Sequence, residues 1–338
     1  MMEKGEYYML ESLEKRCRLF VRNRDIMKEN FRWDNPIFYP LCASIYTFKD
    51  LEIQPLKIKD CKEIIKESTG IFSNFKSIAL LPLASILALE ESPKEKFLLV
   101  LRAYDILKDE LKSSPYLPLA AFVLASMAEA QDFQRIALKA GNIYRRMKME
   151  HPILTSKEDC GFAVLFALSS LSEEKAINEI EKCYSFLRSE FFSGNAVQGV
   201  SHTLALREEE AEEKCRRTLE IFTKLKEKGC RYGTGAELST LGLLALMGRE
   251  PEEVASDIAL VNDFLLSCKG FGAFGIGKAQ RIMYAALLVA KECEKEVEDS
   301  AVNTALVNSI TSIIIAEQAA IAAAIAASTA AAASSSSN

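Results

Sequence analysis

The sequence predicts an all-α protein made of helical hairpins, about six to seven of them and roughly 40 residues each, arranged as an α-solenoid or an α/α toroid. Two observations lead to this fold class: short apolar segments recur at regular spacing, and longer amphipathic segments lie between them. The chain of 338 residues has only 15 glycines and 9 prolines, which disfavours many short strands and tight turns. An open or a closed array fits these patterns equally, because closure depends on a small rotation per repeat.

The short segments, called A segments here, are rich in apolar and small residues. They start at residues 41, 81, 117, 161, 197, 238 and 281, so successive starts are 40, 36, 44, 36, 41 and 43 residues apart. Their ranges are Leu41–Tyr46, Leu81–Leu89, Leu117–Ser126, Gly161–Ser170, Val197–Leu206, Leu238–Met247 and Arg281–Ala290. Helices that are apolar nearly all round are typical of a buried layer.

The longer segments, called B segments, are charged on one side and are expected to form the outer layer. The clearest are Lys94–Lys112, Asp132–Met149, Glu173–Ser189, Arg207–Gly229 and Pro251–Lys269. Four of them share an aromatic residue, an aliphatic residue three positions on and a cation directly after it: Tyr104, Leu107 and Lys108; Tyr144, Met147 and Lys148; Tyr184, Leu187 and Arg188; Phe222, Leu225 and Lys226. This spacing places the aromatic and the aliphatic side chain on one helical face. We expect each hairpin to be an A segment followed by its B segment, with the glycine-bearing stretches 229–235 and 270–277 between hairpins.

The pattern divides the chain into three parts. Residues 1–35 are expected to form a charged helix that caps the first repeat, with Trp33 in a core or capping position. Residues 36–299 form the predicted repeat domain. Residues 300–338 form an Ala/Ser-rich helix and tail, which we interpret as a helix docked on the last repeat or as an interaction helix. Polar residues and weakly apolar alanines in this tail argue against a membrane span.

Composition limits the classes of function. The formal net charge of -5 gives no general attraction to phosphate, so no nucleic acid is expected as a partner. Nine dispersed cysteines with no CxxC pair, and only His151 and His202 as histidines, predict free thiols and no metal site. The first thirty residues are charged throughout and lack a signal-peptide core, so a cytoplasmic location is expected.

The stretch 270–279 resembles two phosphate-binding motifs. It contains GxxxxGK from Gly272 to Lys278 and GxGxxG from Gly270 to Gly275, but a B segment rather than a strand precedes it, and Ala279 stands where a P-loop needs Ser or Thr. We therefore interpret it as a loop between helices and predict no cofactor. The candidates for a weak anion site are Gly275, Gly277, Lys278 and Arg281, where amides and cations meet at a helix start.

The residues 31–36, 69–73, 154–159 and 274–278, together with the Ala-rich tail, resemble an uncharacterised bacterial family known as domain of unknown function 4003. The resemblance covers nearly the whole chain. It implies a bacterial cytosolic protein and supplies no activity or functional residues.

No catalytic constellation is evident, so the leading hypothesis is a protein-interaction scaffold that binds a protein partner or associates with itself. The A-segment surface or the loops between helices would form its binding face. The alternative is an α/α-toroid enzyme or small-ligand binder whose pocket is lined by the inner helices.

Overall fold

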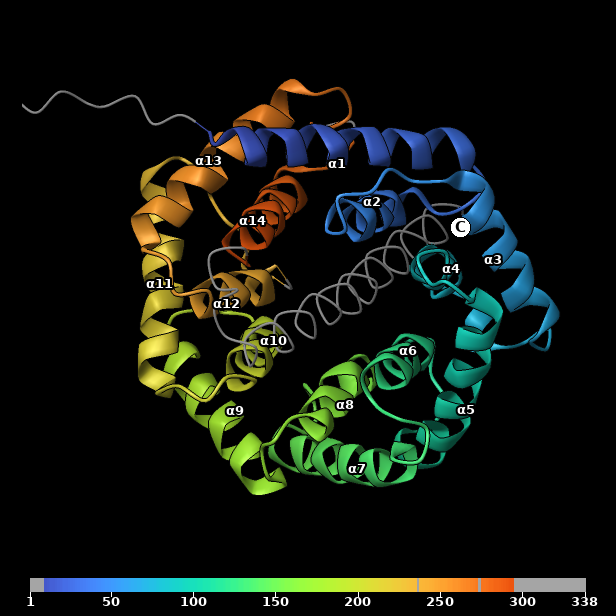
Figure 1. Ribbon diagram of the computed structural model, residues 1–338. Helices are drawn as coiled ribbons and strands as arrows, with labels where there is room; N and C mark the ends of the chain where they lie inside the picture. The colour runs from blue at the N-terminus through green and yellow to red at the C-terminus, as the bar shows by residue number, and fades with distance from the viewer. Residues whose placement is uncertain (1–8, 236, 273–274, 295–338) are drawn as a thin grey trace, which may run out of the picture. The chain divides into compact units, whose positions relative to one another are not determined.

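The computed structural model describes residues 9–235, 237–272 and 275–294. Within these residues the protein is all-helical: it has fourteen α-helices and three short 3-10 helices, and no β-strand (Figure 1). The all-α class predicted from the sequence is therefore confirmed. The predicted helix in the Ala-rich tail lies outside the described residues.

Helices of two kinds alternate along the chain. Each predicted A segment falls on one of the even-numbered helices, called A helices here: α2 (Tyr39–Thr47), α4 (Leu80–Leu87), α6 (Leu117–Met127), α8 (Cys160–Leu168), α10 (Gly194–Ala205), α12 (Leu238–Leu246) and α14 (Lys278–Glu294). The odd-numbered helices, called B helices, are α1 (Glu11–Asn30), α3 (Pro55–Glu67), α5 (Pro93–Leu111), α7 (Phe133–Glu150), α9 (Glu173–Leu187), α11 (Ala211–Glu227) and α13 (Pro251–Ser267). All five predicted B segments are helical, and α3 is a further B helix that the shared sequence signature does not mark.

Local signals explain many of the helix ends. Proline occupies the first turn of α3, α5 and α13, where its missing N–H costs no hydrogen bond. Ser156 and Asp159 form a capping box at the 3-10 helix Lys157–Asp159, which leads into α8. A positive φ follows three B helices, at Lys112 (61°), Gly229 (78°) and Gly270 (90°). These residues turn the chain out of the helix.

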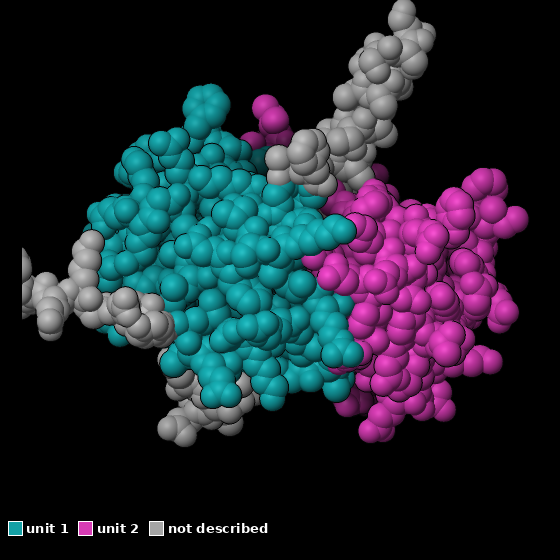
Figure 2. Space-filling model, turned by 90° about the horizontal axis from the view of Figure 1, so that it is seen from above, with its two compact units in different colours: residues 1–22, 47–51, 179–307 teal, residues 23–46, 52–178, 308–338 magenta. Residues whose placement is uncertain are grey.

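The chain separates into two compact units, coloured in Figure 2. Among the described residues, unit 2 comprises 23–46 and 52–178. In it the B helices α3, α5 and α7 pack on one another in chain order, and the A helices α4, α6 and α8 do the same. Each B helix also packs on an A helix, so unit 2 has two layers, as predicted for alternating amphipathic and apolar segments.

The described part of unit 1 comprises residues 9–22, 47–51 and those from 179 to 294 apart from 236, 273 and 274, and it has the same two layers. The B helices α11 and α13 pack on each other, and the A helix α12 packs on both α10 and α14. A Cβ atom added at Gly242 of α12 would lie 2.8 Å from Val200 Cγ2, so glycine permits the close approach of α10 and α12. The division between the two units falls inside α1, after Arg22, and inside α9, after Asn178.

The pairing of helices corrects one prediction. The main A-helix neighbour of α5, α7, α11 and α13 is the A helix that follows each of them, not the one before. Three pairs share a polar contact in which a cation of the B helix donates to a carbonyl at the end of the next A helix: Lys96 to Ala125 O (3.1 Å), Lys139 to Ser169 O (3.0 Å) and Arg217 to Ala245 O (2.7 Å). The cations satisfy carbonyls that the helix end leaves open. The glycine-bearing stretches therefore lie inside a B–A pair rather than between pairs.

Candidate functional site

The loop after α13 holds the anion-site candidates. Gly275 N donates to Gly272 O (3.0 Å), and Ile276 N donates to Gly270 O (2.9 Å), so these two amides are engaged within the loop. A Cβ atom at Gly275 would lie 2.1 Å from Gly270 O, which explains the glycine. The element before the loop is helix α13, as the sequence interpretation required.

The two cations of this candidate site have different environments. Arg281 is 5% exposed, and its guanidinium donates to Asn262 Oδ1 and to Phe271 O, both at 3.0 Å. Lys278, Gly275 and Gly277 are exposed. Arg281 therefore holds the loop against α13, while Lys278 faces outward at the start of α14. Anion binding by this group remains a prediction.

The other groups considered from the sequence are structural in their setting. All nine cysteines are free thiols, and all but Cys268 are buried. His202 is buried within α10, and His151 ends α7. Among the residues that the structure describes, no three His, Cys, Asp or Glu side chains are placed to share a metal ion. In the same part of the chain, no helix combines the length and the apolar character needed to cross a membrane.

Exposed apolar side chains define a different candidate. Among the described residues, five large apolar side chains are more than four-fifths exposed, and all of them lie in connections that lead from a B helix to the next A helix: Trp33 (96%), Ile71 (83%), Phe72 (101%), Ile153 (93%) and Phe192 (97%). We call these B–A connections. Trp33 corrects the sequence prediction, which placed it in the core or in a cap.

Each of three B–A connections buries one aromatic residue and exposes another. Phe31 is 3% exposed beside Trp33, Phe75 is 1% exposed beside Phe72, and Phe191 is 4% exposed next to Phe192. Phe31 lies beneath the ammonium groups of Lys59 and Lys62 of α3. Phe191 packs edge-on against Phe222 of α11, with ring centroids 5.2 Å apart. A buried anchor thus fixes the loop, while its aromatic neighbour remains in solvent.

The sequence signature of the B helices holds these connections in place. The aliphatic members Leu107, Met147, Leu187 and Leu225 are all buried. Four of the aromatic and cationic members bond to the connection that follows: Tyr104 Oη lies 3.0 Å from Ser113 Oγ, Tyr144 Oη donates to Ser156 O (3.1 Å), Lys148 donates to Thr155 O (2.6 Å) and Arg188 donates to Phe191 O (2.9 Å). The recurring residues therefore serve the loops as well as the core.

Successive B–A connections of unit 2 are also joined to one another. Asn74 donates to Ser113 Oγ (2.7 Å) in the next connection, and Tyr116 of that connection donates to Glu158 Oε1 (3.0 Å) in the one after it. Lys62 bonds to Asp34, beside Trp33, at 2.5 Å. Phe72 and Ile153 consequently lie on connections that polar contacts join in series, and the connection that carries Trp33 is held to α3.

Charge distinguishes these connections from those that follow A helices. In unit 2 the four B–A connections 31–38, 68–79, 112–116 and 151–159 have four cations and three acids, a net charge of +1 (4 − 3). The connections 88–92, 128–132 and 169–172, which lead from an A helix to a B helix, have four acids and no cation, a net charge of −4. The acids lie in 88–92 and 128–132, and unbalanced acidic charge is costly to bury, so the B–A connections, whose charges nearly balance, are better suited to burial against a partner.

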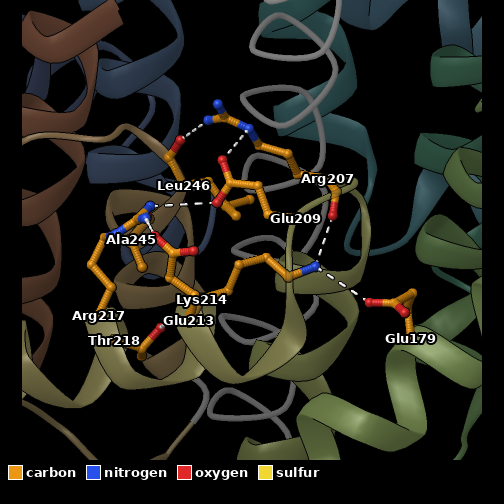
Figure 3. A network of polar contacts seen from close by, with 9 residues as sticks. All are labelled: Glu179, Arg207, Glu209, Glu213, Lys214, Arg217, Thr218, Ala245 and Leu246. Atoms are coloured by element: carbon orange, nitrogen blue, oxygen red, sulfur yellow. Dashed lines mark hydrogen bonds and ion pairs between the residues drawn. The ribbon is translucent and has the colours of Figure 1, made fainter.

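A second polar feature lies in unit 1. Lys214 of α11 is 0% exposed; its Nζ donates to Arg207 O (2.7 Å) and lies 3.7 Å from Glu179 Oε2 (Figure 3). Arg217 Nη1 lies 3.5 Å from Glu209, and Arg207 lies 2.9 Å from the same carboxylate. Glu209 is therefore part of an ion-pair network that ties the start of α11 to the end of α12.

Two A helices of unit 1, α10 and α12, are more polar inside than α6 and α8 of unit 2. Six polar side chains are buried on α10 and α12: Gln198, Ser201, His202, Thr203, Ser239 and Thr240. By contrast, α6 and α8, both fully described, have no buried Ser, Thr, Asn, Gln, His or charged side chain. A polar stretch in an otherwise apolar layer is the feature that an internal ligand would require.

The sequence did not identify Phe72, Ile153 or Phe192 as candidate contact residues. A signal was present: each predicted loop held more bulky apolar residues than a short connection can bury. The sequence does not tell which residue of a pair such as Phe191 and Phe192 becomes the anchor.

The fold and site define an all-helical protein of alternating B and A helices, with apolar side chains displayed on the B–A connections. The family model described as "Protein of unknown function (DUF4003)" matches residues 23–319, and the chain belongs to this family. The uncharacterised protein YeaA of Bacillus subtilis (strain 168) is 27% identical over 201 residues, which is 57% of this chain and 61% of YeaA. The match thus spans less than two thirds of YeaA. No solved structure matches the chain.

Proposed function

We propose that this protein is a helical-repeat interaction scaffold whose B–A connections in unit 2 bind a protein partner. The observation that carries the proposal is the nearly complete exposure of Trp33, Phe72 and Ile153 on loops that are themselves anchored. Large apolar side chains on preorganised loops lose little conformational entropy when a partner covers them. Aromatic residues of this kind are also enriched among the residues that dominate binding energy.

The finer architecture belongs to the same proposal. The repeated cation-to-carbonyl contacts and the repeated anchoring of loops support a series of equivalent B–A pairs. We keep the predicted division into an N-terminal helix (1–35), a repeat region (36–299) and an Ala/Ser-rich tail (300–338), and a cytoplasmic location, as parts of this proposal.

Site-specific photocrosslinking in the native host tests the binding face. A benzophenone amino acid placed at Ile153 is expected to give discrete adducts with a partner, or with a second copy of the chain. The same probe at Leu138 of α7, which is 45% exposed, is the matched control and is expected to give none. The double variant Trp33→Ser/Phe72→Ser is expected to reduce the Ile153 adduct several-fold, because the linked loops would share one partner.

Three results would refute the proposal: no adduct from Ile153, equal adducts from Leu138, or an Ile153 adduct that the double variant leaves unchanged. Circular dichroism of the double variant controls for folding, and substitution of exposed residues is expected to leave it intact.

A second function has its own supporting observation. The buried polar side chains on α10 and α12 favour a small-ligand or enzymatic site within unit 1. Native mass spectrometry of the purified full-length protein tests this alternative. A bound small molecule that is lost in the variant His202→Phe would support it, and a mass equal to that of the bare chain would count against it.

A further inference from the structure

Each of the four B–A connections of unit 2 carries a single lysine or arginine. These residues are Arg32, Lys76, Lys112 and Lys157. Lys76 is half-buried, and the other three are exposed. Within the part of the chain that the structure describes, none of the four side chains makes a hydrogen bond or an ion pair. Their charges are therefore free to interact with a partner.

The acids of the same connections are engaged within the chain. Asp34 accepts from Lys62 of α3 (2.5 Å), and Glu158 accepts from the hydroxyl of Tyr116 (3.0 Å). Asp159 accepts from the backbone amide three residues before it (2.7 Å), and burial raises the pKa of its carboxyl to about 7. Since the acids are paired, hydrogen-bonded or partly protonated at neutral pH, the charge left over for a partner is positive.

Three of these cations lie close in sequence to a nearly fully exposed apolar side chain. The pairs are Arg32 and Trp33, Phe72 and Lys76, and Ile153 and Lys157. Each of these connections also contains a 3-10 helix that a side chain caps, at Asn35, Ser73 and Ser156. A cation and an apolar side chain are thus presented together on a loop of fixed shape.

We propose that the partner presents to unit 2 an acidic peptide segment, in which carboxylates are interspersed with large apolar side chains. This inference rests on the proposed function and names the chemistry of its partner. The carboxylates pair with the four cations, while the apolar side chains cover Trp33, Phe72 and Ile153. Apolar burial supplies most of the affinity, and complementary charge speeds association and selects the partner.

The charge pattern favours a peptide over an anionic lipid surface. Lipid surfaces are recognised by clusters of about four to eight cations. Here each connection supplies one cation, three acids lie among them, and the whole chain has a net charge of -5. A peptide can instead place single carboxylates opposite successive connections. Neighbouring helices lie about 10 Å apart, which an extended chain spans in about three residues.

Fluorescence anisotropy of full-length protein with three short labelled peptides tests the proposal. The first peptide has Glu at every third position and Leu or Phe between; the second has Lys in place of Glu, and the third has Ser in place of Leu and Phe. The first is expected to bind at least about tenfold more tightly than either of the others, and to weaken as salt is added. Phosphatidylglycerol vesicles are the fourth probe and are expected to bind no protein.

A charge-matched pair of variants assigns this binding to the connections. Lys112→Gln/Lys157→Gln removes two connection cations and is expected to weaken the first peptide about fivefold. Lys57→Gln/Lys94→Gln removes two exposed cations near the starts of α3 and α5 and is expected to leave the affinity unchanged. Circular dichroism of both variants controls for folding.

The crosslink from Ile153 in the native host separates this inference from the function on which it rests. Mass spectrometry of the adduct is expected to identify a partner peptide with both acidic and large apolar residues near the linked position. An adduct on a segment without acids, a Glu peptide that binds no more tightly than the Lys peptide, or vesicle binding that Lys112→Gln/Lys157→Gln abolishes would each overturn the acidic assignment. None of these results removes the Ile153 adduct, whereas its absence would refute the binding face itself.

Discussion

At the scale of single residues, burial in the B–A connections depends on competition between neighbours. Phe191 and Phe192 are identical and adjacent, yet they are 4% and 97% exposed. Phe31 occupies the buried position that the sequence prediction gave to Trp33, because Lys59 and Lys62 of α3 cover its ring. Composition shows that a connection is rich in aromatic residues, but only the packed helices determine which of them is the anchor. The candidate contact residues could therefore be predicted as a group and not one by one.

Asp159 gives the first prediction, a pH dependence of stability. Its carboxylate accepts a hydrogen bond from Ser156 N (2.7 Å), but loss of hydration raises its pKa from 3.8 to about 7. The folded chain thus binds more protons at this site than the unfolded chain between about pH 4 and pH 7. The protonated Asp159 carboxyl therefore contributes its full stabilisation to the folded chain below pH 3.8, and this contribution is lost as pH rises to about 7. Each pKa unit is worth about 1.4 kcal/mol, so the fall amounts to between about 1 and 4 kcal/mol.

The variant Asp159→Asn isolates this effect, because the amide oxygen can still accept from Ser156 N but cannot titrate. Urea unfolding from pH 4 to pH 8 is expected to show a smaller decline for the variant than for the wild type, and the variant is expected to be the more stable at pH 7. Parallel curves for the two proteins would contradict the prediction.

At the scale of elements, hydrophobic pattern and spacing predicted most helices but not their partners. All seven A segments and all five named B segments are helical, since their periodicity and their proline and serine starts act locally. The pairing of each B helix with the following A helix depends on crossing geometry, which the pattern does not contain. The recurring cation of the signature lies near the C-terminal end of its helix, where positive charge is stabilising. In Lys148 and Arg188 it also bonds to the next connection.

The second prediction concerns the cations that close the A helices. Lys139→Met keeps the apolar stem of the side chain but removes the ammonium that donates to Ser169 O at the end of α8. Loss of one such hydrogen bond is expected to reduce the free energy of unfolding by about 1 kcal/mol. Chemical denaturation measures the change. Lys108→Met is the control, because the ammonium of Lys108 in α5 lies 3.9 Å from the carboxylate of its exposed neighbour Asp105. This substitution is expected to change the free energy of unfolding by no more than about 0.5 kcal/mol. Equal effects of the two substitutions would show that the carbonyl contact is not needed.

At the scale of the whole chain, the N-terminal helix connects elements that are far apart in sequence. In unit 1, Arg16 forms an ion pair with Glu292 of α14, and the ring of Phe20 lies 5.4 Å from that of Tyr284 and 6.0 Å from that of Phe271. In unit 2, Asn23 of the same helix accepts a hydrogen bond from Ile53 N (2.9 Å). The sequence predicted a helix that caps only the first repeat. Contacts across more than 250 residues leave no periodic signal, so the pattern did not predict them.

The third prediction follows from Phe20, which is 0% exposed. Phe20→Ala leaves a cavity between α1, α14 and the loop that carries Phe271, and it is expected to lower the free energy of unfolding by about 3–5 kcal/mol. Hydrogen exchange locates the loss: amides of α14 are expected to exchange faster, although α14 begins more than 250 residues after Phe20. Trp33→Ala is the matched aromatic control, because its side chain is 96% exposed and its removal is expected to change stability by less than about 0.5 kcal/mol. If Phe20→Ala instead accelerates exchange in α2 and leaves α14 protected, α1 acts as the cap that the sequence predicted.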